Sequence, residues 1–375
     1  MTAPAAQTQT QVSAQAQAAG PLPLRVGWVG AADTLERLGR AFNPLAVGLV
    51  DELVKLTAVV PESSSLADLP SPPVEVLTYR RPSLLGGWSR HLEELIESLH
   101  RQKVQVLHAL EAPAWPVCRR LARELDCPCV VSVWALGDAD RLARLDDRVR
   151  AVAAVSEPIR GELEGRHVAA PERIRLIRPG LFQVRHATCF QDPQCSDSIV
   201  VSGRLDYSPP FETVLKSLAE LQSRQYDCVY FLIGNGKAEK RLRTFAERLG
   251  LCQRLTFVDQ QPARQLTGIL KAADLYIMPG GGPHLPLEAL GAQAAGVPVL
   301  FNSAEAADFL IHGQTALRFA PTDAAELTDV LGRLLSDRDW ARLLAERALE
   351  HLRAHHAVGR FVADVVELYR SCVRV

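Results

Sequence analysis

The sequence has almost no net charge. Its 42 Lys and Arg residues nearly balance its 43 Asp and Glu residues, which leaves a formal net charge of -1 at pH 7. A chain without an excess of basic residues has no overall attraction for nucleic acid or for an anionic membrane. We therefore expect no nucleic-acid partner, while peripheral membrane contact through a local patch remains open.

Long apolar runs and a secretion signal are also missing. No stretch reaches the roughly 18 uninterrupted apolar residues that a membrane-spanning helix requires. Residues 1–20, "MTAPAAQTQTQVSAQAQAAG", lack the basic start and the continuous apolar segment of a secretory signal peptide. We predict that residues 1–20 form a disordered tail and that the protein is cytoplasmic.

The eight cysteines form no recognisable framework. Cys127 and Cys129 are separated by a single proline and the others are scattered, so neither a zinc spacing nor a redox C-x-x-C motif is present. We expect buried free thiols, which suit a reducing cytosol, and neither a metal site nor a bound cofactor.

Several common catalytic motifs are absent as well. After the first apolar run, "GWVGAAD" supplies Gly27 and Gly30 but not the G-x-G-x-x-G pattern of a dinucleotide-binding turn. A P-loop, a zinc-binding helix and a G-x-S-x-G elbow are missing too. These absences disfavour nicotinamide-dependent oxidoreductases, P-loop phosphotransferases and α/β-hydrolases.

What is present is an alternation of short apolar runs with longer amphipathic segments. Residues 24–30, 56–61 and 74–79 are typical of buried strands, and residues 43–56 and 87–103 of helices. Strands that alternate with helices form right-handed crossovers and a parallel sheet covered on both faces. The sequence therefore predicts an α/β fold.

The alternation is interrupted once. Residues 183–197, "QVRHATCFQDPQCSD", lose the apolar periodicity, and a second alternation begins at "SIVVSGRL". We predict an N-terminal domain over residues 21–182, a linker over 183–197 and a C-terminal domain over 198–355. Two doubly wound sheets that face each other place a ligand cleft between the domains, at the carboxyl ends of the strands.

The second half resembles a known family. The ordered segments "VSGRL", "FLIGNGKAEKRLRTFAERLGL", "LTFVDQQPARQLTGILKAADLYIMP" and "AAGVPVLFNSAEAADFLIHGQTALRF" are similar to the C-terminal domain of family 4 glycosyltransferases. In the first half, "TLERLGRAFNPLAVGLVDEL" stands where that family has its first acceptor-side helix. The resemblance implies the GT-B fold, with two Rossmann-like domains, and a C-terminal helix over residues 356–375 that returns to the N-terminal domain.

The activity implied by the resemblance is transfer of a sugar, with retention, from a nucleotide-diphosphate sugar to an unknown glycan, lipid or protein acceptor. The leaving diphosphate requires cations and N–H groups around it, and sugar hydroxyls require carboxylates. Arg204, in "SGRL", matches the arginine that contacts phosphate in the family, and we assign it and Glu288 as the catalytic candidates. The resemblance places the donor at Arg204, Gly234, Asn235, Gly236, Val258, Gly281, Gly282, His284, Leu285 and Glu288.

The donor motifs also depart from the family pattern. No lysine follows Arg204 before Lys216, and alignment on "AAGVP" puts Pro283 and Gly291 where the family has two glutamates. Pro286 stands where a glycine would offer its N–H to phosphate. Glu288 is the one carboxylate in residues 279–300. It either binds the ribose of the donor or complements the dipole of the helix that it begins.

On the acceptor side the candidates are His108, Trp134 and Asp138. His108 ends an apolar run and either points into the cleft or is a satisfied core histidine. Trp134 stands where many relatives have a histidine at the reacting centre, and it either stacks on a sugar or packs in the core. Two hypotheses follow for the whole chain: a glycosyltransferase, or a degenerate GT-B protein that binds a glycan, a nucleotide or a partner without catalysis.

Overall fold

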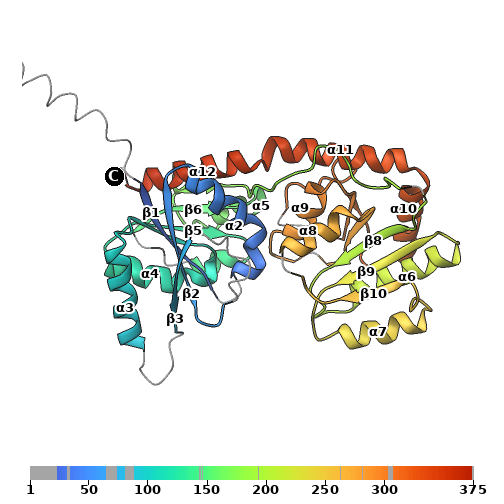
Figure 1. Ribbon diagram of the computed structural model, residues 1–375, viewed down its shortest axis with the longest axis horizontal. Coiled ribbons are helices and arrows are strands. Elements are labelled where there is room, and N and C mark those ends of the chain that lie inside the picture. The colour runs from blue at the N-terminus through green and yellow to red at the C-terminus, as the bar shows by residue number, and fades with distance from the viewer. Residues whose placement is uncertain are drawn as a thin grey trace, which may run out of the picture.

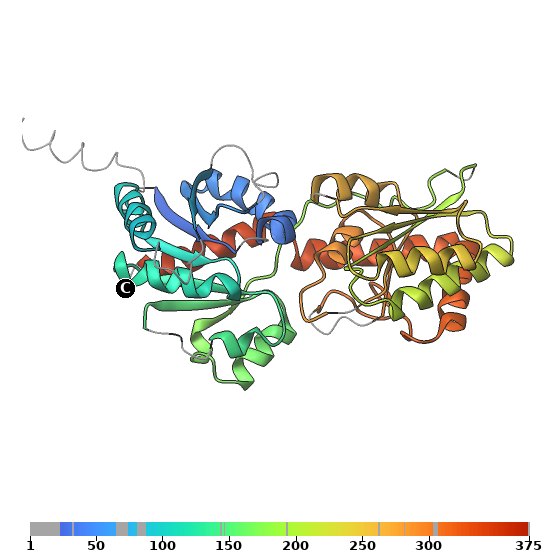
Figure 2. The ribbon, with the colours of Figure 1, turned by 90° about the horizontal axis from the view of Figure 1, so that it is seen from below.

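The computed structural model describes residues 23–31, 34–64, 74–80, 88–142, 145, 147–192, 194–261, 263–280, 282–302 and 307–373. The predicted tail and Gly281 lie outside these residues. The chain forms two α/β domains that lie side by side along the long axis (Figure 1), and a view turned by 90° shows the same arrangement (Figure 2).

The N-terminal domain is built on a sheet whose described strands are all parallel, in the order β3-β2-β1-β4-β5-β6-β7. The order reverses between β1 and β4, and the loops at such a switch point open a crevice at the carboxyl ends of the strands. The strands are β1 (Leu24–Val29), β2 (Val54–Pro61), β3 (Val74–Tyr79), β4 (Val106–Ala109), β5 (Cys129–Val133), β6 (Val149–Ala154) and β7 (Ile174–Leu176).

The helices of this domain include one that begins earlier than its periodicity predicted. The sequence pattern suggested a helix over residues 43–56, but α2 spans Thr34–Asp51 and residues 54–56 belong to β2. Pro44 lies inside α2. Its missing N–H is tolerated because the helix buries a continuous apolar face through Leu38, Leu45 and Leu49. The other helices are α3 (Trp88–Arg101), α4 (Trp115–Glu124) and α5 (Glu157–Gly165), with short 3-10 turns η1 (Ala112–Ala114), η2 (Asp138–Leu142) and η3 (Pro171–Arg173).

The C-terminal domain repeats this design with described strands in the order β10-β9-β8-β11-β12-β13, again all parallel. Its switch point lies between β8 and β11. The predicted α/β class, with two doubly wound parallel sheets, is confirmed. The strands are β8 (Asp197–Ser202), β9 (Cys228–Ile233), β10 (Leu255–Val258), β11 (Leu275–Met278), β12 (Val299–Phe301) and β13 (Leu317–Arg318). The helices are α6 (Pro209–Ser223), α7 (Glu239–Arg248), α8 (Ala263–Lys271), α9 (Leu287–Ala294), α10 (Ala324–Ser336) and α11 (Arg338–His355).

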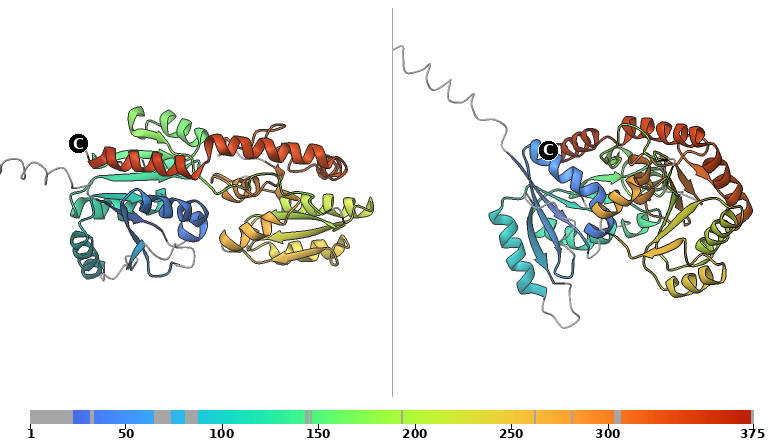
Figure 3. Two further views of the ribbon diagram at one scale, coloured as in Figure 1. Left: turned by 45° about the horizontal axis from the view of Figure 1, so that its top comes forward. Right: turned by 45° about the vertical axis from the view of Figure 1, so that its right-hand side comes forward.

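The last helices join the two domains. Helix α11 packs against α9, and α12 (Val358–Val373) packs against α2, β4 and β6 of the N-terminal domain. The two helices run along one side of the whole molecule (Figures 1 and 3). They meet at His356, which is fully buried and whose Nδ1 lies 2.8 Å from the carbonyl oxygen of Pro179. Burial lowers the pKa of His356 to about 4, so the ring is neutral at neutral pH.

Two further features bear on the sequence predictions. All eight cysteines are free, but Cys195 and Cys252 are exposed, so the expectation of buried thiols holds only for the other six. Both exposed thiols lie in connecting segments, which cover no core. Among the residues that the structure describes, no helix is both long and apolar enough to cross a bilayer.

Candidate functional site

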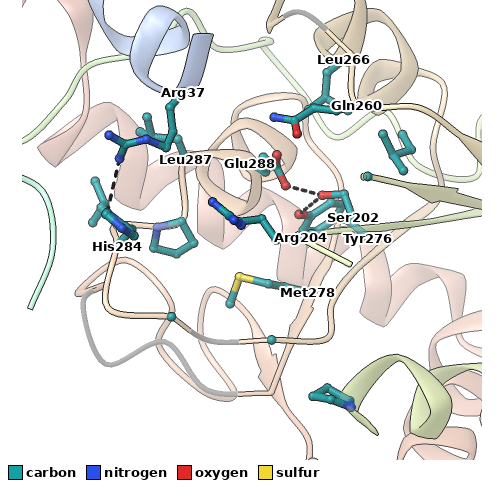
Figure 4. Close-up of a pocket in the computed structure, with 18 of the residues that line it drawn as sticks. Arg37, Ser202, Arg204, Gln260, Leu266, Tyr276, Met278, His284, Leu287 and Glu288 are labelled. Carbon is teal, nitrogen blue, oxygen red and sulfur yellow. Dashed lines mark hydrogen bonds between the residues drawn. The ribbon is translucent and has the colours of Figure 1, made fainter. Parts of the chain in front are cut away.

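A pocket of about 470 Å³ lies between the domains, at the carboxyl ends of β8 and β11. Its volume and its position at a switch point are typical of small-ligand sites in doubly wound folds. Figure 4 shows side chains of both domains pointing into it. The polar residues in its wall are Arg37, Ser202, Arg204, Tyr207, Gln260, Gln261, Tyr276, His284, Glu288 and Asn302.

Glu288 lies in the wall of this pocket, in the first turn of α9. Its Oε2 accepts a hydrogen bond of 2.5 Å from the hydroxyl of Ser202. The same Ser202 hydroxyl lies 2.7 Å from the hydroxyl of Tyr276 (Figure 4). Tyr276 is fully buried, and this burial raises its pKa well above the usual value, so it stays protonated. The carboxylate is therefore held by Ser202 at the end of β8 and lies in the wall of the pocket, while its place in the first turn of α9 also complements the helix dipole.

Arg204 follows β8 and lines the same pocket. Its side chain is 80% exposed, and its Nε and Nη2 lie 3.0 and 2.7 Å from Oδ2 of Asp206. An exposed ion pair of this kind contributes little stability, so its guanidinium can exchange Asp206 for another anion at small cost. The geometry keeps Arg204 available to a diphosphate.

A second guanidinium enters the pocket from the N-terminal domain. Arg37 of α2 donates to the carboxylate of Glu111, and its Nη1 lies 3.4 Å from Nδ1 of His284 (Figure 4). Glu111 is only 2% exposed and also accepts from the hydroxyl of Thr34. The sequence prediction did not include Arg37 or Glu111. A sequence signal that could have pointed to Arg37 is a helix that starts directly after β1, at the carboxyl edge of the sheet, and carries two basic residues three positions apart.

The loop between β11 and α9 pairs with the N-terminal domain. Ala135 and His284 form an antiparallel bridge, in which Leu285 N–H donates to Trp134 O at 2.8 Å and Leu136 N–H donates to Pro283 O at 2.7 Å. This pairing corrects one expectation: the N–H of Leu285 is turned toward the other domain and is not offered to a diphosphate. Gly282, His284 and Leu285 all line the pocket, and Gly281 lies outside the described residues.

The turn after β9 is packed tightly against the turn after β8. Gly234 lines the pocket with φ of 151°, and a Cβ there would lie 2.0 Å from the carbonyl oxygen of Gly203. A Cβ on Gly236 would lie 2.2 Å from the carbonyl carbon of Leu205. These two glycines are therefore required by backbone packing, whatever the pocket binds. Gly236 does not line the pocket, contrary to expectation.

Asn235 and Val258, which were also expected to bind the sugar donor, do not line the pocket. Oδ1 of Asn235 accepts from the N–H of Gln260 at 3.0 Å, which ties the turn after β9 to the loop after β10. The carbonyl of Val258 accepts from the N–H of Gly234 at 3.0 Å. Neither Asn235 nor Val258 is among the lining residues, because each is engaged in joining adjacent strand ends.

The three acceptor-side candidates occupy different environments. Trp134 is among the residues that line the pocket but is only 2% exposed: its ring packs edge to face against Phe42, and its Nε1 donates to Leu110 O at 2.8 Å. His108 does not face the pocket: it is 2% exposed and lies 2.8 Å from Ser132 Oγ and 2.6 Å from Tyr369 Oη. Asp138 begins η2, outside the lining; burial raises its pKa, and Arg141, 3.5 Å away, opposes this shift. Of the three, only Trp134 lines this pocket.

Burial of His108 predicts a pH-dependent contribution to stability. Burial lowers the pKa of His108 to about 3, so the unfolded chain takes up this proton below about pH 6.5 while the folded chain does not. The stabilisation is therefore complete above pH 6.5 and is lost as the pH falls toward 3. At pH 8 the free energy of unfolding should be larger for wild type than for His108→Gln. This difference should be about 2 kcal/mol smaller at pH 5. Urea denaturation at both pH values measures it, and an advantage independent of pH would contradict the buried neutral state.

The C-terminal domain matches the model of a known protein family. Residues 193–351 match the model of the family described as glycosyl transferases group 1. The chain is 33% identical over 179 residues to a D-inositol 3-phosphate glycosyltransferase of Corynebacterium urealyticum. The aligned region covers 45% of this chain and 42% of that protein. A protein of the same name from Nocardia farcinica is 28% identical over 279 residues, covering 69% of this chain and 60% of that protein. The chain thus spans about half the length of these relatives.

Solved structures share the whole architecture. HepE of Anabaena, solved in complex with UDP and glucose, superposes with a TM-score of 0.75 at 16% identity, over 93% of this chain and 100% of that one. The GT-B fold that the sequence implied is therefore confirmed for both domains.

Proposed function

We propose that this chain, whose residues 193–351 match the model of the glycosyl transferases group 1 family, transfers a sugar from a nucleotide-diphosphate sugar to an acceptor, with retention of configuration. One observation carries the proposal: Arg204 and Glu288 line the same interdomain pocket, at the switch point of the C-terminal sheet. In doubly wound folds this crevice is the place where nucleotides bind.

The charges in the pocket fit the demands of the reaction. As the bond between sugar and diphosphate breaks, negative charge grows on the leaving group, and fixed cations stabilise it. Arg204 from the C-terminal domain and Arg37 from the N-terminal domain would supply that charge. Glu288 would accept hydrogen bonds from hydroxyls of the donor, with its carboxylate oriented by Ser202. Much of the remaining wall is apolar, including Leu266, Met278 and Leu287.

The acceptor would approach beside Trp134, the one residue of the predicted acceptor side that lines the pocket. Trp134 is only 2% exposed and packs against Phe42, so it would support the acceptor subsite from the core and would not stack on the sugar. We leave the acceptor as a hydroxyl of a glycan, a lipid or a protein. The eight free cysteines suit a reducing compartment, and we propose the cytoplasm.

Binding of nucleoside diphosphates tests the proposal. Ligands that bind the native state raise the melting temperature, so a panel of UDP, ADP and GDP with their glucose esters should identify the donor nucleotide. For that nucleotide, Arg204→Ala should weaken binding by about 1.5–3 kcal/mol, the range for a charged hydrogen bond. Calorimetry measures the loss. Arg241→Ala is the matched control, because Arg241 is also exposed (69%) and paired with a carboxylate, Glu212, but lies outside the pocket lining.

The outcomes separate the two hypotheses. Unchanged affinity in Arg204→Ala would remove Arg204 from the site. Binding of a nucleotide sugar without release of nucleotide, in the presence or absence of acceptors, would favour a binding protein over an enzyme. No response to any nucleotide would leave a glycan- or partner-binding module, which is the reading favoured by the missing lysine and by Gly291.

A further inference from the structure

Helix α2 carries a second arginine that crosses the domain boundary. Arg40 lies one helical turn after Arg37, and α2 packs against α8 and α9 of the C-terminal domain. Unlike Arg37, Arg40 does not line the pocket and is only 9% exposed. Burial lowers its pKa from the ordinary value, while Glu288 and Tyr276 oppose this shift. A buried guanidinium of the N-terminal domain thus lies close enough to Glu288 to interact with it electrostatically.

The space for this guanidinium is created by a glycine. A Cβ at Gly291 would lie 2.0 Å from Nη1 of Arg40 and 2.8 Å from its Cζ. Any side chain at position 291 would therefore displace Arg40. This is the position at which the resemblance implies a glutamate, so the chain has a buried arginine from the other domain where a carboxylate of α9 was expected.

Arg40 approaches α9 on the face that carries Glu288. Glu288 and Gly291 are three residues apart, so they lie on the same side of the helix about one turn from each other. Ser202 of the C-terminal domain donates to Oε2 of Glu288, and Glu288 lines the pocket. The carboxylate is therefore held by a hydroxyl of its own domain and lies in the field of a guanidinium of the other domain.

We infer that Arg40 is a positioning residue: seated over Gly291, it orients the carboxylate of Glu288 in the pocket and makes this orientation dependent on the contact between the two domains. The inference rests on the proposed function only in naming a nucleotide as the ligand of Glu288. Arg40 acts through Glu288 and has no contact of its own with the ligand.

A double-mutant cycle tests this role, with UDP, or the nucleotide identified by the panel, as the probe. The proteins are wild type, Glu288→Gln, Arg40→Met and the double variant, measured by calorimetry at a temperature at which all are folded. If Arg40 acts through Glu288, Arg40→Met should weaken nucleotide binding about tenfold alone and less than about twofold in the Glu288→Gln background. Gly291→Ala should reproduce the loss of Arg40→Met, since it unseats the guanidinium without removing a charge.

Arg338→Met is the control for general destabilisation, because Arg338 pairs with the buried Asp197 at 3.0 Å, outside the pocket lining. It should lower the melting temperature and leave nucleotide affinity unchanged. An equal loss of affinity from Arg40→Met in both backgrounds, or no loss in either, would overturn the inference.

The stability of the same four proteins tests the contact independently of the ligand. Removing Arg40 takes a positive charge away from the neighbourhood of Glu288, whereas the double variant leaves neither charge. Arg40→Met should therefore lower the melting temperature less in the Glu288→Gln background than in wild type. If no nucleotide binds, the proposed function fails, but this coupling still decides whether Arg40 holds Glu288; additive losses would reject it.

Discussion

Gly234→Ala is expected to lower the free energy of unfolding by about 3–5 kcal/mol, from a strained backbone and a steric overlap together. The φ of Gly234 is 151°, which side-chain-bearing residues rarely adopt, and the new Cβ would lie 2.0 Å from the carbonyl oxygen of Gly203. That carbonyl belongs to the main chain between β8 and α6 and cannot rotate away as a side chain would. Urea denaturation measures the loss.

Gly280→Ala provides the control within the same pocket. Gly280 also lines the pocket, but nothing lies within 4 Å of the position of its Cβ. We expect a change in unfolding free energy within about 0.5 kcal/mol, as for most substitutions away from packed features. Equal costs at the two positions would show that the turns after β8 and β9 are not packed as described. A loss of nucleotide affinity in Gly280→Ala without loss of stability would show that the ligand approaches the main chain there.

Tyr369→Ala should lower the free energy of unfolding by about 3–5 kcal/mol, the usual cost of removing a buried aromatic ring. Tyr369 is fully buried in α12, and its hydroxyl accepts from Trp28 Nε1 at 2.9 Å and lies 2.6 Å from His108 Nδ1. Its loss leaves a cavity between α12 and the sheet and leaves buried polar atoms of Trp28 and His108 without this partner. The C-terminal helix should then detach more readily from the N-terminal domain, which limited proteolysis would detect.

Tyr369→Phe separates the two contributions. The ring remains and only the hydroxyl is lost, so the expected cost is about 1–3 kcal/mol, the penalty for unsatisfied buried polar groups. A Phe variant as unstable as the Ala variant would assign the whole effect to the hydrogen bonds. An Ala variant as stable as wild type would mean that α12 does not anchor the end of the chain.

Most of the fold could be predicted from the sequence because it depends on short-range periodicity. Apolar runs of four to eight residues separated by amphipathic segments specify buried parallel strands and crossover helices, and the predicted run at 74–79 coincides with β3. The start of α2 could not be read from periodicity. The apolar pattern indicated a helix from residue 43, whereas the helix begins at Thr34, where the family-like segment also begins, and buries its first turns against the sheet.

The candidate site was only partly predictable, for a physical reason. Arg204 and Glu288 follow strand ends of one sheet, and parallel strands bring such residues to the same edge, so their proximity was implied by the pattern. His108 also follows that rule, yet its ring turns into the core, where Ser132 and Tyr369 satisfy both nitrogens. The direction of a side chain at a strand end depends on which partners the packed interior offers it.

The sequence by itself determined the α/β class, the two parallel sheets and the edge at which a ligand would bind, since these follow from residue type and spacing along the chain. Only the tertiary structure decided what fills that edge. It placed Arg37 in the pocket, packed Arg40 over Gly291 of α9, and paired the loop before α9 with the end of β5. These contacts join segments from different domains, and their geometry depends on how two packed surfaces meet, a property that no local pattern of residues records.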